Sequence, residues 1–241
     1  GGYSPAFGEY WYPGWSGTTV YRYSTAHQFL GTFRSGRNRI MQLSGDTDGT
    51  YYTAHWNGQK VSKWQALSSN LIWSVDLNAT VGGVTSDNQY VYAMDYRAPT
   101  VWKIDKTTGR LEETFTVPSM AGTLYGGLQL IDGVFYVGRH HGVVYRIDLA
   151  TRQLLGTATL DTNIYNMSWD GYDYCVSANN SSLFCYEVCD STVRPQASPI
   201  QVSTPVNTAV DITLSGTDPN NLPLTYETVS TTPHGSLTGT P

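Results

Sequence analysis

Charged residues are scarce in this chain. They make up 14% of its 241 residues, whereas an ordinary soluble domain carries about 25%. The formal net charge is -5, and no segment of the sequence gathers Lys and Arg into a cluster. A protein that binds a phosphate backbone needs a concentrated basic surface, so this composition argues against nucleic acid as a partner.

Long apolar runs are absent as well. No stretch of the sequence approaches the roughly 20 apolar residues of a membrane-spanning helix, so we expect no membrane insertion. The first residues, Gly1-Gly2-Tyr3, lack the basic and apolar regions of a signal peptide, as a mature secreted chain does after processing. Uncharged surfaces rich in Tyr, Thr and Asn are typical of extracellular β proteins. We therefore expect the protein to be extracellular or on the cell surface.

Helix-forming residues are sparse. Ala, Glu, Lys and Leu are few, whereas the sequence holds 18 Tyr, 7 Trp and 24 Gly, with many Thr and Ser. Tyr, Trp and Thr side chains fit the half-buried surface of a pleated sheet better than a helix. The composition therefore predicts an all-β fold.

A repeat runs along most of the chain. The segments VYRYS, VSKWQ, VWKID and VVYRID, with a weaker fifth, LFCYEV, align on Val20, Val61, Val101, Val144 and Leu183. The spacings between these positions are 41, 40, 43 and 39 residues. Apolar residues alternate within the segments, which indicates strands rather than the helices of an α-solenoid. A period near 40 built from strands is typical of the four-stranded blade of a β-propeller.

Each repeat contains further segments with strand chemistry. Strands that precede the aligned positions are expected at residues 8–15, 49–56, 88–96, 133–141 and 172–179. Gly-containing inner strands, suited to a crowded propeller axis, are expected at 38–46, 81–88, 124–132 and 164–171, and outer strands at 27–33, 70–77, 110–117 and 152–160. We predict five blades over residues 7–190, with no inner strand in the first blade and no outer strand in the last. A sixth blade from residues outside this chain is the alternative.

The segments IDKTTGR (Ile104 to Arg110) and IDLATRQ (Ile147 to Gln153) are similar to each other. They resemble the strand–turn–strand signature of bacterial-type propeller repeats, namely the quinoprotein-like, NHL and YVTN-like families. The resemblance covers roughly residues 7–190. It implies the architecture alone, because no ligand set of these families matches this sequence residue by residue.

The chain changes character at Asp190, where a linker rich in Thr, Ser and Pro begins. The echoes ITLSGTDP, LPLTY and PHGSLTG resemble the tandem cadherin-like or Ig-like repeats of large bacterial surface proteins. A complete sandwich needs about seven strands over about 100 residues, so residues 191–241 predict a linker and a partial sandwich. We expect the 210–241 segment to complete its sheet on another copy by strand addition, which builds a filament. The alternative is that the chain is a fragment of a larger protein.

The turn between the second and third strand of each blade is the first candidate for a site. Polar and aromatic side chains recur there and face one funnel, as a weak ligand-binding set: Trp15, His55, Asp95, Arg139, His140 and Asn179. Turns are also polar because they meet water, and no nucleophile and base have a definable spacing. We therefore expect no catalytic residues.

Metal sites are weakly indicated. His140 and His141 are adjacent, so on a strand they point to opposite faces and do not share a metal. The DTDG segment at 46–49 lacks the ligands of a calcium loop. In the tail, Asp218 and Asn220 are weak calcium candidates through the cadherin-like resemblance, and otherwise we expect no cofactor.

Two covalent modifications follow from the sequence. Cys175 is expected to form a disulfide with either Cys185 or Cys189, because the three lie on adjacent strands of the last blade, although reduced core cysteines are the alternative. Four N-x-Ser/Thr triplets would be glycosylated if the source is eukaryotic and the chain is secreted: Asn78, Asn166, Asn179 and Asn180.

These observations support three functions. The first is an extracellular structural or adhesive protein that assembles with other copies of itself. The second is an enzyme of the lactonase or lyase type that acts in the funnel through His55, Asp95, Arg139 and His140. The third is a lectin-like module in which Trp11, Trp15 and Trp56 stack on sugar rings. The absence of a catalytic set favours the first.

Overall fold

The computed structural model describes most of the chain. The described residues are 1–117, 120, 125–171, 173–177, 183–187, 196–198, 200–205, 208–217, 224 and 226. The chain divides into two compact units, Gly1–Glu187 and Val188–Pro241. Within the described ranges all regular structure is β, and none of these residues forms a helix that could cross a membrane.

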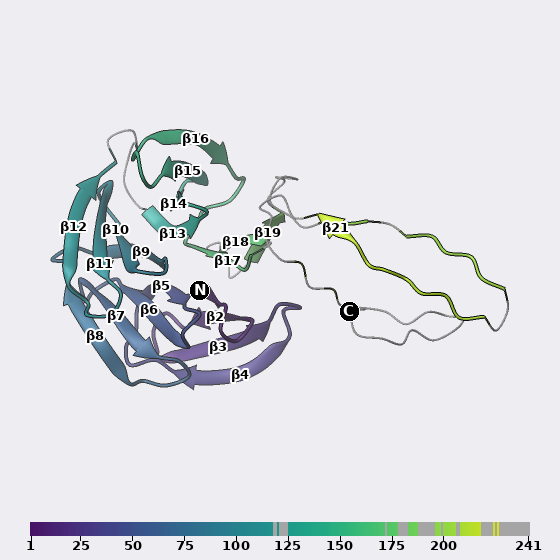
Figure 1. Ribbon diagram of the computed structural model, residues 1–241. Coiled ribbons are helices and arrows are strands. Elements are labelled where there is room, and N and C mark those ends of the chain that lie inside the picture. Colours follow the sequence, from purple (N-terminus) through teal and green to yellow (C-terminus); the bar gives the residue numbers. More distant parts are fainter. Residues whose placement is uncertain are drawn as a thin grey trace. The chain divides into compact units, whose positions relative to one another are not determined.

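The first unit is a five-bladed β-propeller (Figure 1). Blades one and two each have four antiparallel strands: β1 (Gly2–Ser4), β2 (Glu9–Pro13), β3 (Thr19–Ser24) and β4 (Phe29–Arg34), then β5 (Ile40–Gly45), β6 (Thr50–His55), β7 (Lys60–Gln65) and β8 (Leu71–Asp76). Blade three follows the same order with β9 (Val81–Ser86), β10 (Tyr90–Asp95), β11 (Thr100–Asp105) and β12 (Leu111–Thr116). Blade four comprises β13 (Tyr125–Ile131), β14 (Val134–Arg139), β15 (Val143–Asp148) and β16 (Leu154–Thr159). The described strands of blade five are β17 (Asn166–Trp169), β18 (Asp173–Ser177) and β19 (Leu183–Glu187).

The repeat predicted from the sequence is confirmed strand by strand. All five aligned positions fall in the third strand of their blades, from Val20 in β3 to Leu183 in β19. One detail of the prediction is wrong, because the first blade does have an inner strand. Gly2–Ser4 pairs with β2, with Tyr3 opposite Tyr10. Gly2 is at this position because a Cβ there would lie 1.7 Å from the carbonyl oxygen of Leu43.

The inner strands close into a ring around the axis. Each inner strand contacts the next, from β1 through β5, β9 and β13 to β17, and β17 contacts β1 again. Five blades therefore complete the propeller, and the sixth blade that the sequence left open is not needed. The first and last blades meet without exchanging a strand between them in the described residues.

A glutamine blocks the propeller axis. Gln42 on β5 is fully buried, and its amide makes four hydrogen bonds of 2.9 Å. Its Nε2 donates to the carbonyls of Leu128 and Met167, and its Oε1 accepts from the backbone N–H groups of Val84 and Leu128. One side chain thus links the inner strands of blades two, three, four and five, and every polar atom of its amide is satisfied.

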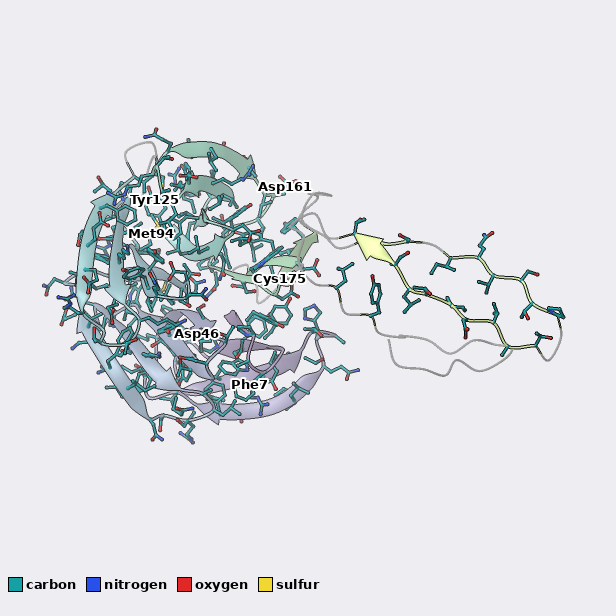
Figure 2. The ribbon with its side chains drawn as sticks, in the orientation of Figure 1. Phe7, Asp46, Met94, Tyr125, Asp161 and Cys175 are labelled. Atoms are coloured by element: carbon teal, nitrogen blue, oxygen red, sulfur yellow. A yellow bond between two sulfur atoms is a disulfide. The ribbon has the colours of Figure 1, made fainter. Side chains whose placement is uncertain are left out.

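Aromatic side chains fill the space between neighbouring sheets (Figure 2). Between blades one and two, Trp11 packs edge-on against Phe33 and Tyr51, with ring centroids 5.1 and 5.8 Å apart. Strands β5 and β6 are buried along their whole length, whereas the outer strand β8 alternates between exposed and half-buried residues. Burial thus decreases from the inner to the outer strand of a blade. The Tyr- and Trp-rich segments form second and third strands because both faces of these strands pack against a neighbouring sheet.

The turns between third and fourth strands follow one pattern in the two segments that resemble each other. In 104–110, the Asp105 carboxylate accepts hydrogen bonds from the N–H and hydroxyl of Thr108. In 147–153, Asp148 binds Thr151 in the same way. The backbone then needs a positive φ, which Gly109 supplies at 74° and Arg152 at 60°.

The second unit has one described strand pair. Gln196–Ala197 (β20) pairs with Gly216–Thr217 (β21), and Ser198 N–H donates to the carbonyl of Ser215. Between the two strands, five large apolar side chains are exposed: Ile200, Val202, Val210, Ile212 and Leu214.

Candidate ligand-binding face

One end of the propeller carries the turns between second and third strands and the connectors between blades. We call this end the turn face, which comprises the described residues 14–18, 35–39, 56–59, 77–80, 96–99, 117, 120, 140–142 and 160–165. Backbone hydrogen bonds tie the turns to the connectors. Arg39 N–H donates to the carbonyl of Trp15, and Trp56 N–H donates to the carbonyl of Arg39, each at 3.1 Å. The connector at Arg39 is therefore held between two tryptophans.

Five rings form a continuous row across the turn face. Trp15 contacts Trp56 with centroids 6.1 Å apart, and Trp56 contacts Tyr96 at 4.7 Å. Tyr96 then contacts His140 at 5.7 Å, and His140 contacts Tyr165 at 4.2 Å. We call these five residues the aromatic row. The row extends from blade one to the connector before blade five. Its three middle members, Trp56, Tyr96 and His140, each directly follow the second strand of their blade.

Exposure differs along the aromatic row. Trp15 is 54% exposed, Trp56, His140 and Tyr165 are half-buried, and Tyr96 is buried. The row therefore offers an open indole at one end, held in place by rings that pack behind it. A rigid, partly exposed aromatic plane of this kind binds apolar faces of a ligand at little cost in side-chain entropy.

His55 lies below the surface of the turn face. It is 2% exposed, its Nε2 lies 2.8 Å from the hydroxyl of Thr53, and the same hydroxyl accepts a hydrogen bond from the indole of Trp64. Burial, and then the nearby charge of Arg37, lower the pKa of His55 from 6.5 to about 4. His55 is therefore a neutral, buried side chain at neutral pH and not a ligand-facing group.

Asp95 ends β10 and Arg139 ends β14, and His140 of the aromatic row directly follows Arg139. The Asp95 carboxylate accepts a hydrogen bond from the N–H of Arg97 at 2.7 Å, at the bulge that ends β10. Burial, and then the nearby His141, lower the pKa of His140, and its Nε2 is buried with no hydrogen-bond partner among the described residues. In the described part of the chain, His55, Asp95 and His140 do not hydrogen-bond to one another, and no three His, Cys, Asp or Glu side chains gather as a metal site.

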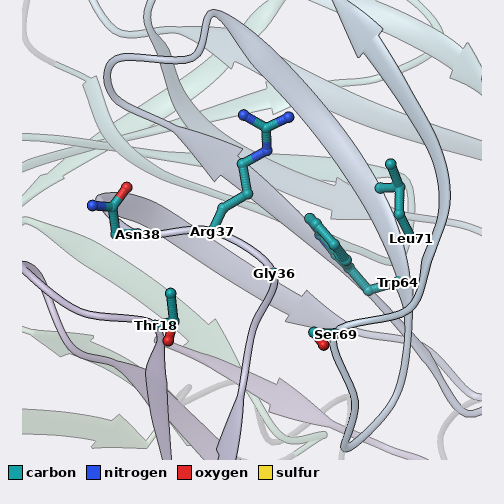
Figure 3. Close-up of a pocket in the computed structure, with 7 residues that line it drawn as sticks. All are labelled: Thr18, Gly36, Arg37, Asn38, Trp64, Ser69 and Leu71. Carbon is teal, nitrogen blue, oxygen red and sulfur yellow. The ribbon is translucent and has the colours of Figure 1, made fainter.

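A depression of about 590 Å³ adjoins the turn face (Figure 3). Arg37 and Asn38 line it from the connector between blades one and two, and Thr18 lines it from the neighbouring turn. The indole of Trp64 and the side chain of Leu71 line the blade-two part. A Cβ at Gly36 would lie 2.2 Å from the ring of Trp64. Only glycine therefore fits at this position of the connector without a shift of the indole.

The other residues predicted from the sequence have mixed outcomes. A disulfide joins Cys175 and Cys185, which are directly opposite each other on β18 and β19, so one of the two predicted pairings is confirmed. Trp11 is fully buried, so its assignment as a sugar-stacking residue is wrong. Asn166 is buried and its Nδ2 donates to the carbonyl of Met41, which leaves no room for a glycan there, whereas Asn78 is exposed.

Several predicted residues lie outside the described part of the chain. Asn179 was predicted both for the funnel and for glycosylation, and Asn180 for glycosylation alone. The others are Cys189 and the calcium candidates Asp218 and Asn220.

The sequence reasoning did not identify Tyr96 and Tyr165 as members of the face. Tyr96 was detectable, because it occupies the position after the second strand that holds Trp56 and His140 in the neighbouring blades. Tyr165 precedes β17 in a connector, where no repeat position marks it. No protein-family model matches the chain, and no curated protein sequence is significantly similar to it.

Proposed function

We propose that this protein is an extracellular adhesive module whose turn face binds glycan chains. The observation that carries the proposal is the aromatic row, with Trp15 exposed at its end and supported by Trp56. Sugar rings have apolar C–H faces that stack on indole and phenol planes, while their hydroxyls stay in contact with water and polar side chains. The Gln42 amide, which bonds to three other inner strands around the axis, favours binding on the surface of the face rather than in a central channel.

Two further features support an extracellular location. The Cys175–Cys185 disulfide is of a kind that persists in oxidising compartments. The low content of charged residues, 14%, is in keeping with extracellular β proteins. We also propose that the propeller is related to the NHL, quinoprotein-like or YVTN-like propellers. We propose a cadherin-like origin for the second unit.

Enzymatic activity of the lactonase or lyase type is the less supported alternative. Such chemistry needs an acid and a base within hydrogen-bond reach of one substrate atom. His55 is buried and neutral, and the Asp95 carboxylate is held by the N–H of Arg97. These contacts argue against the two side chains as an acid and a base for one substrate.

Binding to immobilised polysaccharides tests the glycan proposal. Trp15→Ala should weaken binding about tenfold, because it removes the exposed stacking plane. Phe29→Ala is the matched control, since Phe29 is also an exposed aromatic but begins β4 at the opposite end of blade one. If the two variants bind every polysaccharide as the unaltered protein does, the aromatic row is not a glycan site.

A second function, self-assembly, is supported by the exposed apolar residues of the second unit. Val210, Ile212 and Leu214 are exposed alternate residues, so in a strand they would lie on one apolar face. Addition of this strand to another copy would cover that face and build a filament. Replacing all three with Thr should abolish polymers seen by electron microscopy, whereas replacing exposed residues outside the segment should not. Polymers that persist in the Thr variant exclude this route of assembly.

A further inference from the structure

The cationic side chains of the propeller differ sharply in whether they are paired. Away from the turn face, each Lys and Arg described has a partner of its own. The ion pairs are Arg22–Glu9, Lys63–Asp48, Lys106–Asp46, Arg110–Glu112 and Arg152–Glu113, and Lys103 and Arg146 lie over the rings of Tyr90 and Tyr136. Carboxylates balance the first five charges, and a tyrosine ring contacts each of the other two.

Four arginines have neither an ion pair nor a side-chain hydrogen bond in the described part of the chain, and all four are exposed: Arg34, Arg37, Arg39 and Arg97. Arg34 ends β4 opposite Thr19, at the edge of the turn face. Arg37, Arg39 and Arg97 lie within the turn face itself. Unpaired guanidinium groups are therefore concentrated at one end of a protein whose net charge is -5.

These arginines follow the exposed end of the aromatic row. The backbone of Arg39 hydrogen-bonds to both Trp15 and Trp56. Arg97 directly follows Tyr96. Arg37 lines the depression beside this end of the row, together with Asn38 (Figure 3). A chain that lies on the two tryptophans thus lies on the same face as these guanidinium groups.

Three carboxylates lie near this face. The Asp95 carboxylate accepts a hydrogen bond from the N–H of Arg97, and Asp76 forms an ion pair with Lys60 at 3.7 Å. Asp161 is exposed in the connector that also holds Tyr165. His140 in the row and His55 below the surface of the turn face add little charge at neutral pH, because burial lowers the pKa of both side chains. Arg39, whose backbone binds both tryptophans, and Arg37, two residues before it, thus present positive charge that no ion pair neutralises among the described residues.

We propose that the ligand of this face is an acidic polysaccharide, whose anionic groups are bound by Arg37, Arg39 and Arg97 while its sugar rings stack on Trp15 and Trp56. The inference rests on the proposed glycan-binding function and specifies its substrate class. A guanidinium group binds a carboxylate or a sulfate through two parallel hydrogen bonds, so uronate and sulfated sugars share the required chemistry. The depression of about 590 Å³ is in the size range of small-molecule sites and can admit a sugar unit beside the main chain of the ligand.

The test measures binding of the whole protein to four immobilised polymers by biolayer interferometry at low and at physiological salt. The polymers are polygalacturonate, dextran sulfate, neutral dextran and single-stranded DNA. We expect both acidic polysaccharides to bind more tightly than dextran, and added salt to weaken their binding because it screens the exposed charges. Comparison of polygalacturonate with dextran sulfate shows whether carboxylate or sulfate is preferred.

Charge-removing variants identify the residues. Arg37→Gln and Arg39→Gln should each weaken binding of the preferred acidic polymer about tenfold, the usual effect of losing a hydrogen bond to a charged group. The same variants should weaken binding to dextran much less, because dextran carries no anionic group for the guanidinium to bind. Arg110→Gln is the matched control, because Arg110 is an exposed arginine paired with Glu112 away from the turn face. Unchanged melting temperatures for the three variants show that the fold is intact.

The outcomes separate the two proposals. If dextran binds as tightly as the acidic polymers, or if the Arg37 and Arg39 variants bind as the control does, the acidic ligand is excluded while glycan binding stands. If no polysaccharide binds, both proposals are wrong. Binding of DNA at least as tight as that of the acidic polysaccharides overturns the assignment to a glycan.

Discussion

The hydroxyl of Tyr10 donates a hydrogen bond of 2.6 Å to the carboxylate of Asp170, although 160 residues separate them. Tyr10 lies on β2 of the first blade, and Asp170 follows β17 of the last. In blades two and three the corresponding pairs, Tyr52–Asp46 and Tyr92–Asp87, are formed within a single blade. The contact at Tyr10 thus joins the two ends of the propeller by side chains rather than by a shared strand.

Replacing Tyr10 with Phe should loosen the closure of the ring. The change removes one hydrogen bond to a carboxylate and should lower the free energy of unfolding by about 1–2 kcal/mol. Tyr92→Phe is the matched control, since its hydroxyl binds Asp87 at 2.9 Å within blade three. Hydrogen exchange should become faster in β17 and β18 for Tyr10→Phe alone. Equal protection of these strands in both variants would show that the contact does not hold the ends together.

Gln42 should stabilise the ring of inner strands more than any other polar side chain described. Gln42→Met keeps the volume of the side chain but removes the partner of the backbone N–H groups of Val84 and Leu128 and of the Leu128 carbonyl. The Met167 carbonyl keeps a hydrogen bond from Gln129. We expect the free energy of unfolding to fall by about 3–5 kcal/mol, measured by chemical denaturation. Gln65→Met, at an exposed position on β7, is the control and should change stability by less than about 0.5 kcal/mol. A small effect at Gln42 would mean that the inner strands hold together without this side chain.

The repeat could be predicted from the sequence because each blade places apolar and aromatic residues at the same strand positions. Val20, Val61 and Val101 mark these positions without any knowledge of tertiary contacts. The inner strand Gly2–Ser4 could not be found, because three residues carry no alternation and their pairing depends on β2 and on the approach to Leu43.

The candidate site was predictable only in part. His55 and Asp95 were chosen because polar side chains at these turns were expected to face one funnel, yet packing buries His55 and the backbone of Arg97 engages Asp95. Gln42 reads as an ordinary polar residue in an apolar segment. Its four partners come from three other blades, so only the closed ring shows its role.

The protein should lose stability as the pH falls from about 6.5 to about 4. His55 is neutral in the folded protein, with its pKa lowered to about 4, but binds a proton near pH 6.5 when the chain is unfolded. The unfolded state therefore binds more protons within this window, and acid favours it by up to about 3 kcal/mol. His55→Gln should reduce this slope in denaturation curves measured between pH 4 and 7. His141→Gln, at an exposed histidine, should leave it in place, and equal slopes in all three proteins would contradict the assignment.

The disulfide between Cys175 and Cys185 should stabilise the last blade. Its sulfurs join the middle strand β18 to β19, and Cys175 Sγ lies 3.6 Å from the hydroxyl of Tyr10 in the first blade. The bridge spans 10 residues, so it restricts the unfolded chain and should contribute about 2–3 kcal/mol. The Cys175→Ala/Cys185→Ala double variant should therefore melt at a lower temperature than the unaltered protein.

Reductant provides the control for this prediction. It should lower the melting temperature of the unaltered protein and leave that of the double variant unchanged. The chain has three cysteines, so the unaltered protein, denatured without reductant, should show one reactive thiol, and three after reduction. Three thiols before reduction would show that the bridge is absent. The stability of the last blade would then rest on its strand pairing and on the Tyr10–Asp170 contact, and Tyr10→Phe would become the more damaging change.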